Sequence, residues 1–261
     1  MTLTQNHEKN SIIKLQASLT KNGPILRNGI VWRIFSISKT SMDQEWPLVA
    51  SSTKAVYTFS LPEGEYLIHA AFGQVSRTKH LMLGKGKQSE IIILNAGGIQ
   101  LKAALPKGVI NKSQLKFSIY SDDTENNEHG LILSKIKPDK IVRLNSGTYH
   151  VVSHYGDGNA IVRSDLQVEA GKITEATMQH RAGEVTLKLV RQKGREALAD
   201  TSWAITNESG DIVYETTNAY AYMILAEGDY FAVAKNKNQI YQKHFSISSG
   251  NKKEIEILSN T

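Results

Sequence analysis

Residues 61–66 read Leu-Pro-Glu-Gly-Glu-Tyr, and two further copies of this stretch follow it in the chain. Residues 144–149 read Leu-Asn-Ser-Gly-Thr-Tyr and residues 225–230 read Leu-Ala-Glu-Gly-Asp-Tyr, so the shared pattern is Leu-x-x-Gly-x-Tyr. The three tyrosines lie 83 and then 81 positions apart. A fixed period of this length indicates a small domain that occurs three times, since a single solenoid turn is shorter.

The similarity between the copies extends to both sides of this pattern. Upstream of the pattern, each copy has an apolar stretch that begins with an aromatic residue, in segments 32–36, 117–121 and 203–207. Downstream, each copy has a polar stretch that begins with a glycine, in segments 86–90, 171–175 and 250–254. The alignment predicts a flexible N-terminus over residues 1–11 and three repeats over 12–97, 98–182 and 183–261. The joints carry no Ser- or Pro-rich spacer, which limits the freedom of a flexible linker.

Composition and charge restrict the class of protein. The 261 residues are 40% hydrophobic and 21% charged, which is ordinary for a folded chain, and each repeat can bury a modest core. The chain has no cysteine, which excludes disulfides and thiolate metal sites. Its formal charge of +6 comes from basic residues scattered along the sequence. That excess permits weak attraction to anionic surfaces, but no nucleic-acid motif accompanies it, so we expect no nucleic-acid partner.

The start of the chain leaves the compartment open. Residues 1–10 are polar and lack the apolar segment of a signal peptide. No apolar run reaches the length of a membrane span, so none is expected. The protein is therefore either cytoplasmic as given or a mature form from which an export signal has been removed.

Apolar residues recur at every second position through most of the chain. In the first copy, Tyr66, Ile68 and Ala70 alternate with Leu67 and His69. Such alternation, bounded by Gly, Asn, Asp and Ser clusters, predicts strands and turns, and no stretch shows capped helical spacing. Short strands with turns at roughly ten-residue spacing are typical of antiparallel sandwiches. The sequence therefore predicts an all-β chain of three tandem antiparallel β-sandwich domains.

The Leu-x-x-Gly-x-Tyr stretch itself is expected to be a hairpin. Gly64, Gly147 and Gly228 stand where a tight turn can need a positive φ. The leucine before the turn and the tyrosine after it would then face each other across paired strands. The tyrosine hydroxyl is expected to find a backbone partner, as buried tyrosines usually do.

The first copy resembles the carboxypeptidase regulatory-like, or prealbumin-like, domain. Residues 61–70, the turn at Gly86 and the strand 91–94 match that family's Leu-Pro-x-Gly-x-Tyr stretch, glycine turn and apolar strand; the other two copies lack the proline. Residues 32–35 and 149–157 also resemble uncharacterised exported bacterial proteins with three such repeats. The resemblance implies non-catalytic sandwich modules of the immunoglobulin-like or prealbumin-like kind, often periplasmic or secreted, and implies no substrate.

The sequence holds no recognisable catalytic or metal-binding constellation. There is no Gly-x-Ser-x-Gly elbow, and no serine, histidine and acid stand at a known spacing. Residues 83–89 briefly resemble a phosphate-binding loop, but the leading glycine and the following helix are missing. His150 and His154 would lie about 13 Å apart on a strand, too far to share one metal ion. We expect no enzyme activity, no cofactor and no metal site; residues 122–128 are read as a solvated acidic loop, with calcium binding left open.

An aromatic set in the third copy departs from the pattern of the other two. In the strand that precedes the third motif, Met223 and Leu225 occupy the positions that face the core in all copies. The opposite face then carries Tyr220, Tyr222 and Ile224, where the first copy has Thr58 and Ser60.

The next strand adds Phe231 and Val233 on the face opposite Tyr230. If a short turn pairs the two strands, the third repeat carries one contiguous apolar and aromatic patch outside its core. Such a patch marks a contact surface, and tyrosine is enriched at interfaces. The alternative is that a loop or the neighbouring repeat covers it.

Two functions remain open on these grounds. The first is a non-catalytic binding or scaffold protein of the bacterial cell envelope that contacts a protein partner, or a second copy of itself, through the third repeat. The second is a carbohydrate-binding protein in which Tyr220, Tyr222, Trp46 or Tyr155 stacks on sugar rings. Glycan binding predicts exposed aromatics beside polar hydrogen-bonding groups, whereas protein binding predicts a broader and drier patch.

Overall fold

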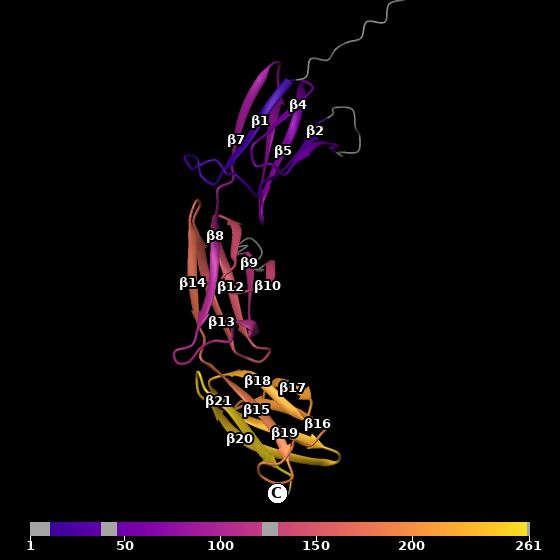
Figure 1. Ribbon diagram of the computed structural model, residues 1–261, viewed down its shortest axis with the longest axis vertical. Coiled ribbons are helices and arrows are strands. Elements are labelled where there is room, and N and C mark those ends of the chain that lie inside the picture. Colours follow the sequence, from indigo (N-terminus) through magenta and orange to yellow (C-terminus); the bar gives the residue numbers. More distant parts are fainter. Residues whose placement is uncertain (1–10, 38–45, 122–129, 260–261) are drawn as a thin grey trace, which may run out of the picture. The chain divides into compact units, whose positions relative to one another are not determined.

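The computed structural model describes residues 11–37, 46–121 and 130–259 (Figure 1). In these residues it contains twenty-one β-strands and one short 3-10 helix, η1 (Lys112–Gln114), and no α-helix. The all-β prediction is therefore confirmed. The expected flexible N-terminus, apart from Ser11, and the acidic run 122–128 lie outside the described residues.

The first repeat forms two facing sheets of three and four strands. The three-stranded sheet has the order β4-β1-β7, and the four-stranded sheet has the order β3-β2-β5-β6. Strand β1 runs antiparallel to β4 but parallel to β7. The strands are β1 (Ser11–Ser18), β2 (Val31–Ser36), β3 (Leu48–Ser52), β4 (Tyr57–Leu61), β5 (Gly64–Phe72), β6 (Val75–Leu83) and β7 (Lys87–Ile93).

The second repeat has the same pair of sheets, with the orders β11-β8-β14 and β10-β9-β12-β13. Its strands are β8 (Ala96–Ala104), β9 (Leu115–Ser121), β10 (Leu131–Ile136), β11 (Ile141–Asn145), β12 (Gly147–Tyr155), β13 (Ile161–Val168) and β14 (Ile173–Gln179).

The third repeat again has sheets of three and four strands, β18-β15-β21 and β17-β16-β19-β20. As in the first repeat, its first and last strands run parallel. Three tandem sandwiches are thus present as predicted, each mainly antiparallel. The strands are β15 (Ala182–Val190), β16 (Thr201–Asn207), β17 (Ile212–Thr217), β18 (Tyr220–Ala226), β19 (Gly228–Asn236), β20 (Gln239–Ile247) and β21 (Lys252–Leu258).

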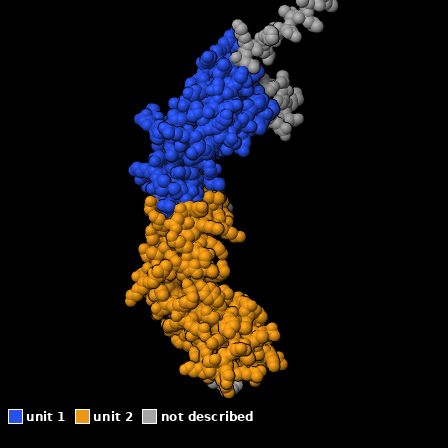
Figure 2. Space-filling model, in the orientation of Figure 1, with its two compact units in different colours: residues 1–100, 141–148, 167–174 blue, residues 101–140, 149–166, 175–261 orange. Residues whose placement is uncertain are grey.

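The chain divides into two compact units that do not coincide with the repeats (Figure 2). Unit 1 comprises residues 1–100, 141–148 and 167–174, and unit 2 comprises residues 101–140, 149–166 and 175–261. The predicted repeat boundaries therefore stay a prediction.

The Leu-x-x-Gly-x-Tyr stretch is not a hairpin, which corrects the sequence prediction. Leu61 ends β4 in one sheet and pairs with Ser11, whereas Tyr66 lies on β5 in the other sheet and pairs with Ser36. Gly64 has φ of 159°, an extended value at the start of a strand. The chain therefore crosses between the two sheets here, so Leu61 and Tyr66 enter one core from opposite sides.

In the first and third copies, the tyrosine hydroxyl bonds to a backbone carbonyl four residues earlier and so holds the crossing in place. Tyr66 donates to the carbonyl oxygen of Pro62 over 2.9 Å, and Tyr230 donates to that of Ala226 over 2.8 Å. The expected backbone partner is thus confirmed for both tyrosines. The arrangement is similar to the tyrosine corner of immunoglobulin-like sandwiches.

The aligned tryptophans of the first and third copies occupy equivalent places in their cores. Trp32 and Trp203 are buried, and their indole nitrogens donate to the carbonyl oxygens of Lys54 (3.1 Å) and Asn218 (2.9 Å). A buried indole N–H needs such an acceptor, so the tryptophan fixes the loop before the crossing strand as well as the core.

Within unit 2, the β12–β13 loop of the second sandwich packs against the third. The amide of Asn159 donates to the Tyr230 hydroxyl over 3.0 Å and accepts from the backbone N–H of Ala226, also over 3.0 Å. A Cβ at Gly156 would lie 2.7 Å from the Cβ of Ile224. Only glycine allows this approach, so Ile224 is buried by the neighbouring repeat.

His180 lies buried beside this contact. Its Nε2 lies 2.7 Å from the Ser153 hydroxyl, and its ring meets the Tyr155 ring edge-on. Burial lowers the pKa of His180 to about 4, and the nearby His154 adds to the effect. The imidazole is therefore neutral in the folded protein at neutral pH.

We expect the stability of the protein to fall as pH decreases from 6.5 toward 4. In this range the unfolded chain binds a proton at His180 that the folded chain does not, which costs up to about 3 kcal/mol at pH 4. Thermal unfolding across this pH range measures the effect. His180→Gln should reduce the change of melting temperature with pH, whereas His80→Gln, at an exposed position, should not. An unchanged pH dependence in His180→Gln would contradict the role of the buried His180 in this loss of stability.

Removal of the two corner hydroxyls should have unequal costs. Tyr66→Phe loses the bond to Pro62, about 1 kcal/mol, whereas Tyr230→Phe also leaves the Asn159 amide without its partner and should cost about 2 kcal/mol. Urea unfolding followed by tryptophan fluorescence gives both values. Equal losses would show that the Asn159 contact contributes nothing.

Candidate functional site

The outer face of the sheet β18-β15-β21 presents two tyrosines beside a group of charged residues. The pairing of the strands places one row along Tyr220, Lys188 and Glu256 and the next row along Tyr222, Thr186 and Glu254. We call these six residues the tyrosine face.

Strand alternation on β18 creates the aromatic part of this face. Ala221, Met223 and Leu225 are buried in the core of the third sandwich, as the sequence predicted for Met223 and Leu225. Tyr220 and Tyr222 point the other way and remain 51% and 38% exposed. Residues two apart on a strand lie about 7 Å apart, so the two rings flank each other on one surface.

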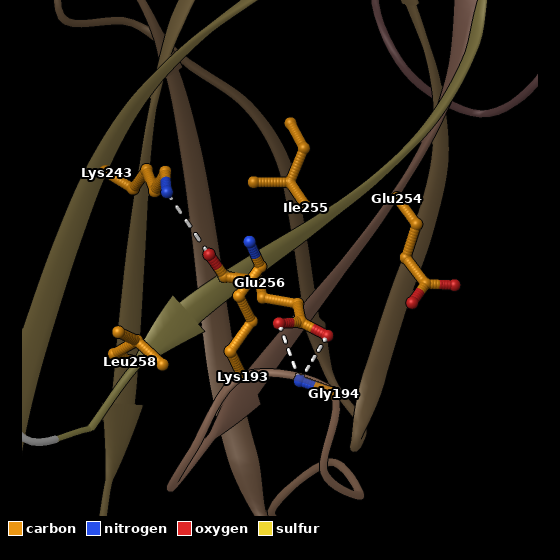
Figure 3. A pocket seen from close by; sticks show the side chains of 7 residues that line it. All are labelled: Lys193, Gly194, Lys243, Glu254, Ile255, Glu256 and Leu258. Carbon is orange, nitrogen blue, oxygen red and sulfur yellow. Dashed lines mark hydrogen bonds between the residues drawn. The ribbon is translucent and has the colours of Figure 1, made fainter.

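Lys188 forms ion pairs with both carboxylates of the face. Its Nζ lies 2.6 Å from Glu254 Oε1 and 3.0 Å from Glu256 Oε1, and these hydrogen bonds raise the pKa of Lys188. The backbone N–H of Gly194 donates to both oxygens of Glu256 at 3.1 and 3.0 Å (Figure 3). That bond and Lys188 lower the pKa of Glu256, so this carboxylate is ionised at neutral pH.

Tyr222 keeps its proton at all physiological pH values. Burial of its hydroxyl raises the pKa to about 12, and the negative charge of Glu184 beside it contributes. The backbone of Tyr222 accepts a hydrogen bond from the Tyr214 hydroxyl over 3.1 Å, which holds the strand in place. Tyr222 therefore offers its ring, while its neutral hydroxyl bonds to Glu184.

Glu256 also lines a hollow of about 550 Å³ next to strand β21 (Figure 3). Lys243 donates to the backbone oxygen of Glu256 over 3.3 Å, and Lys193 and Leu258 form other parts of the lining. The tyrosine face thus adjoins a concave surface that has both charged and apolar groups.

The predicted aromatic patch is not contiguous. Ile224 is 1% exposed, because the β12–β13 loop covers it, which is the alternative that the sequence left open. Phe231 and Val233 lie on β19, in the opposite sheet from β18, so they face away from the tyrosines. The hairpin assumption caused this error. Phe231 is 45% exposed and contacts the ring of His244; its role in binding stays a prediction.

The two further candidates for sugar stacking differ in exposure. Trp46 is 54% exposed, just before β3 in the first sandwich. Tyr155 is 1% exposed: its ring packs on His180, and its hydroxyl accepts from the N–H of Asn111 over 3.2 Å. A buried ring offers no face to a ligand, so the expectation for Tyr155 is wrong in this structure.

The histidine pair singled out in the sequence has separate surroundings. The Nδ1 of His150 lies 2.7 Å from Asp165, and the pKa of His154 is lowered by burial and by nearby basic residues. No group of three or more histidine, aspartate or glutamate side chains placed to hold a metal ion occurs among residues 11–37, 46–121 and 130–259.

In the described part of the chain, no helix is long and apolar enough to span a membrane.

Comparisons with known proteins agree with the repeat organisation. Residues 184–259, which form most of the third sandwich, match the Rhizobiales growth-associated tandem repeat domain. No protein in the curated set matches the sequence. The expected tandem β-sandwich repeats are confirmed by the sheet pairs, and the match identifies the third of them as similar to a known tandem repeat domain.

Several solved structures are similar to the chain at low identity. The TIE protein of Bacillus anthracis is 16% identical with a TM-score of 0.29; the match covers 96% of this chain and 50% of that protein, so the chain spans half its length. A streptococcal ancillary pilin is 11% identical with a TM-score of 0.33 and coverages of 95% and 98%. The minor pilin of Streptococcus agalactiae is 14% identical with a TM-score of 0.33 and coverages of 65% and 95%.

Proposed function

We propose that this chain is a non-catalytic binding protein of the bacterial cell envelope and that its third sandwich recognises a carbohydrate through the tyrosine face. The observation that carries the proposal is the pair of exposed rings, Tyr220 and Tyr222, beside Thr186, Lys188 and Glu254 on one sheet surface. Glycan binding predicts exposed aromatic rings next to polar hydrogen-bonding groups, and this face has that arrangement.

The chemistry of the face suits a sugar. A pyranose ring offers an apolar surface of C–H groups to an aromatic ring and hydroxyls at its rim. Tyr220 and Tyr222 supply the apolar surfaces, Glu254 supplies acceptors, and the Thr186 hydroxyl lies in the row between Tyr222 and Glu254. The centres of protein interfaces are instead depleted of charged residues, whereas three of the six residues of this face are charged.

The electrostatics of the face support binding without hydrolysis. Glycoside hydrolysis needs two carboxyl groups, one of them with a raised pKa so that it can donate a proton. Here Lys188 bonds to both Glu254 and Glu256, and the pKa of Glu256 is lowered. Glu256 therefore remains ionised at neutral pH and has no proton to donate, which favours a binding role over general acid catalysis.

The envelope location is inferred from the exported proteins that the sequence resembles. Absence of cysteine is neutral in this respect, so the location rests on that resemblance alone. A periplasmic or secreted setting would place the tyrosine face in contact with envelope glycans.

A protein partner remains the second candidate, on a different surface. On the outer face of the first sandwich, Leu48, Phe35 and Leu67 lie next to one another across β3, β2 and β5. Arg33 and His69 form the neighbouring row. This band carries three large apolar side chains and is bordered by the cationic Arg33, while burial and Arg33 lower the pKa of His69 and keep it neutral. That combination suits an apolar partner segment with an acidic group at its edge. Alternation along β5 could have revealed Leu67, but not its neighbours.

The double variant Tyr220→Ser/Tyr222→Ser should lose glycan binding and keep its fold. Native gels cast with individual bacterial polysaccharides provide the measurement. We expect at least one polysaccharide to retard the wild type but not the variant, because the variant lacks both aromatic rings that would stack on the sugar. Phe231→Ser, which removes a similarly exposed ring from the opposite sheet, is the matched control and should migrate like the wild type.

Two results would contradict the proposal. Equal retardation of the wild type and the double variant would exclude the tyrosine face. A wild-type dimer in light scattering that becomes monomeric in the double variant would instead assign the face to self-association.

A further inference from the structure

Five lysines of the second sandwich converge on one hollow. Lys112, Lys116, Lys135, Lys137 and Lys140 line a space of about 540 Å³ where β9 begins and β10 ends, within unit 2. All five are exposed. The sequence suggested scattered charges, so this concentration is a product of the fold.

Little negative charge opposes these lysines in the described structure. Asp139 is the carboxylate in the lining, and it bonds to Lys112 over 2.7 Å. Lys116 lies 3.5 Å from Asp157, whereas Lys135, Lys137 and Lys140 form no ion pair with another described residue. The lining, with five lysines and one aspartate, has a charge of +4, and Asp157 beside Lys116 reduces the local charge to +3, against +6 for the whole chain.

The backbone is shaped to bring the lysines together. A β-bulge interrupts the pairing of β10 with β9 between Leu133 and Ile136. Lys135 lies in this bulge with φ of 56°, and Asp139 has φ of 63°. A lysine in the left-handed region is uncommon, and bulges redirect side chains at functional sites.

The fold itself does not require this basic hollow. Residues 135–140 include three lysines, whereas the aligned segment 52–57 of the first copy includes Lys54 alone and the segment 216–221 of the third has none. All three copies form the same pair of sheets. Like charges at close range oppose the compact state, so the cluster costs stability and calls for a ligand that offsets it.

We propose that this hollow binds a flexible polyanionic chain with repeated phosphate groups and without nucleobases. Lysine binds phosphate as a point charge, whereas arginine is the residue that recognises single phosphates or carboxylates in a bidentate way, and the lining contains no arginine. Single-stranded nucleic acids need aromatic side chains on which bases stack, and the lining has none. A phosphate-bearing glycan or inorganic polyphosphate has the required chemistry.

The test uses the full chain with two probes, inorganic polyphosphate and poly(glycerol phosphate), in titrations at several salt concentrations. Release of counterions by about five lysines predicts a slope of log K against log salt of about −3 to −4. The variant Lys135→Gln/Lys137→Gln/Lys140→Gln should bind at least about tenfold more weakly and reduce the slope by more than half. Tighter binding of poly(glycerol phosphate) would indicate the glycan source, and tighter binding of polyphosphate the inorganic one.

A charge-matched control separates this site from the general basicity of the protein. Lys21→Gln/Lys85→Gln/Lys87→Gln removes three exposed lysines from the first sandwich and should change affinity less than about threefold. Tyr220→Ser/Tyr222→Ser should bind both probes like the wild type, because neither tyrosine lines the hollow. Equal weakening in both lysine variants would overturn the proposal, as would stronger binding of a single-stranded oligonucleotide or of anionic lipid vesicles than of either probe.

Discussion

The tyrosine at the crossing between sheets is the constraint on which the first and third sandwiches depend. Its hydroxyl holds a carbonyl oxygen four residues earlier, at Pro62 in the first copy and at Ala226 in the third. The chain can then pass from one sheet to the other within a few residues while both flanking strands enter one core. In the third copy, Tyr230 also receives the amide of Asn159, so the same residue links the second sandwich to the third.

This crossing decides which surfaces are available for binding. Since β18 and β19 belong to opposite sheets, the outward side chains of the two strands point in opposite directions. Tyr220 and Tyr222 are left with the charged residues of β15 and β21, which turns an apparent apolar patch into a mixed aromatic and polar surface. The hydrogen-bonded carboxylates of that surface are suited to holding a ligand and poorly suited to proton transfer.

Sequence periodicity predicted the strands, the core positions and the repeat, because alternation reports which face of a strand is buried. It could not report which strand lies beside which, and so it joined Phe231 and Val233 to the tyrosines. The burial of Ile224 depends on Gly156 from another repeat, and the lysine hollow depends on a bulge at Lys135. Neither contact leaves a periodic signal, since both arise only after the strands are paired.

The most direct test of the account is an NMR titration of the full chain, labelled in its tyrosine and phenylalanine rings, with a polysaccharide that retards it in native gels. We predict that the ring resonances of Tyr220 and Tyr222 shift with saturation while those of Phe231 and the buried Tyr155 stay in place. Shifts confined to Phe231, or shifts spread evenly over all exposed rings, would contradict the assignment of the tyrosine face as the binding surface.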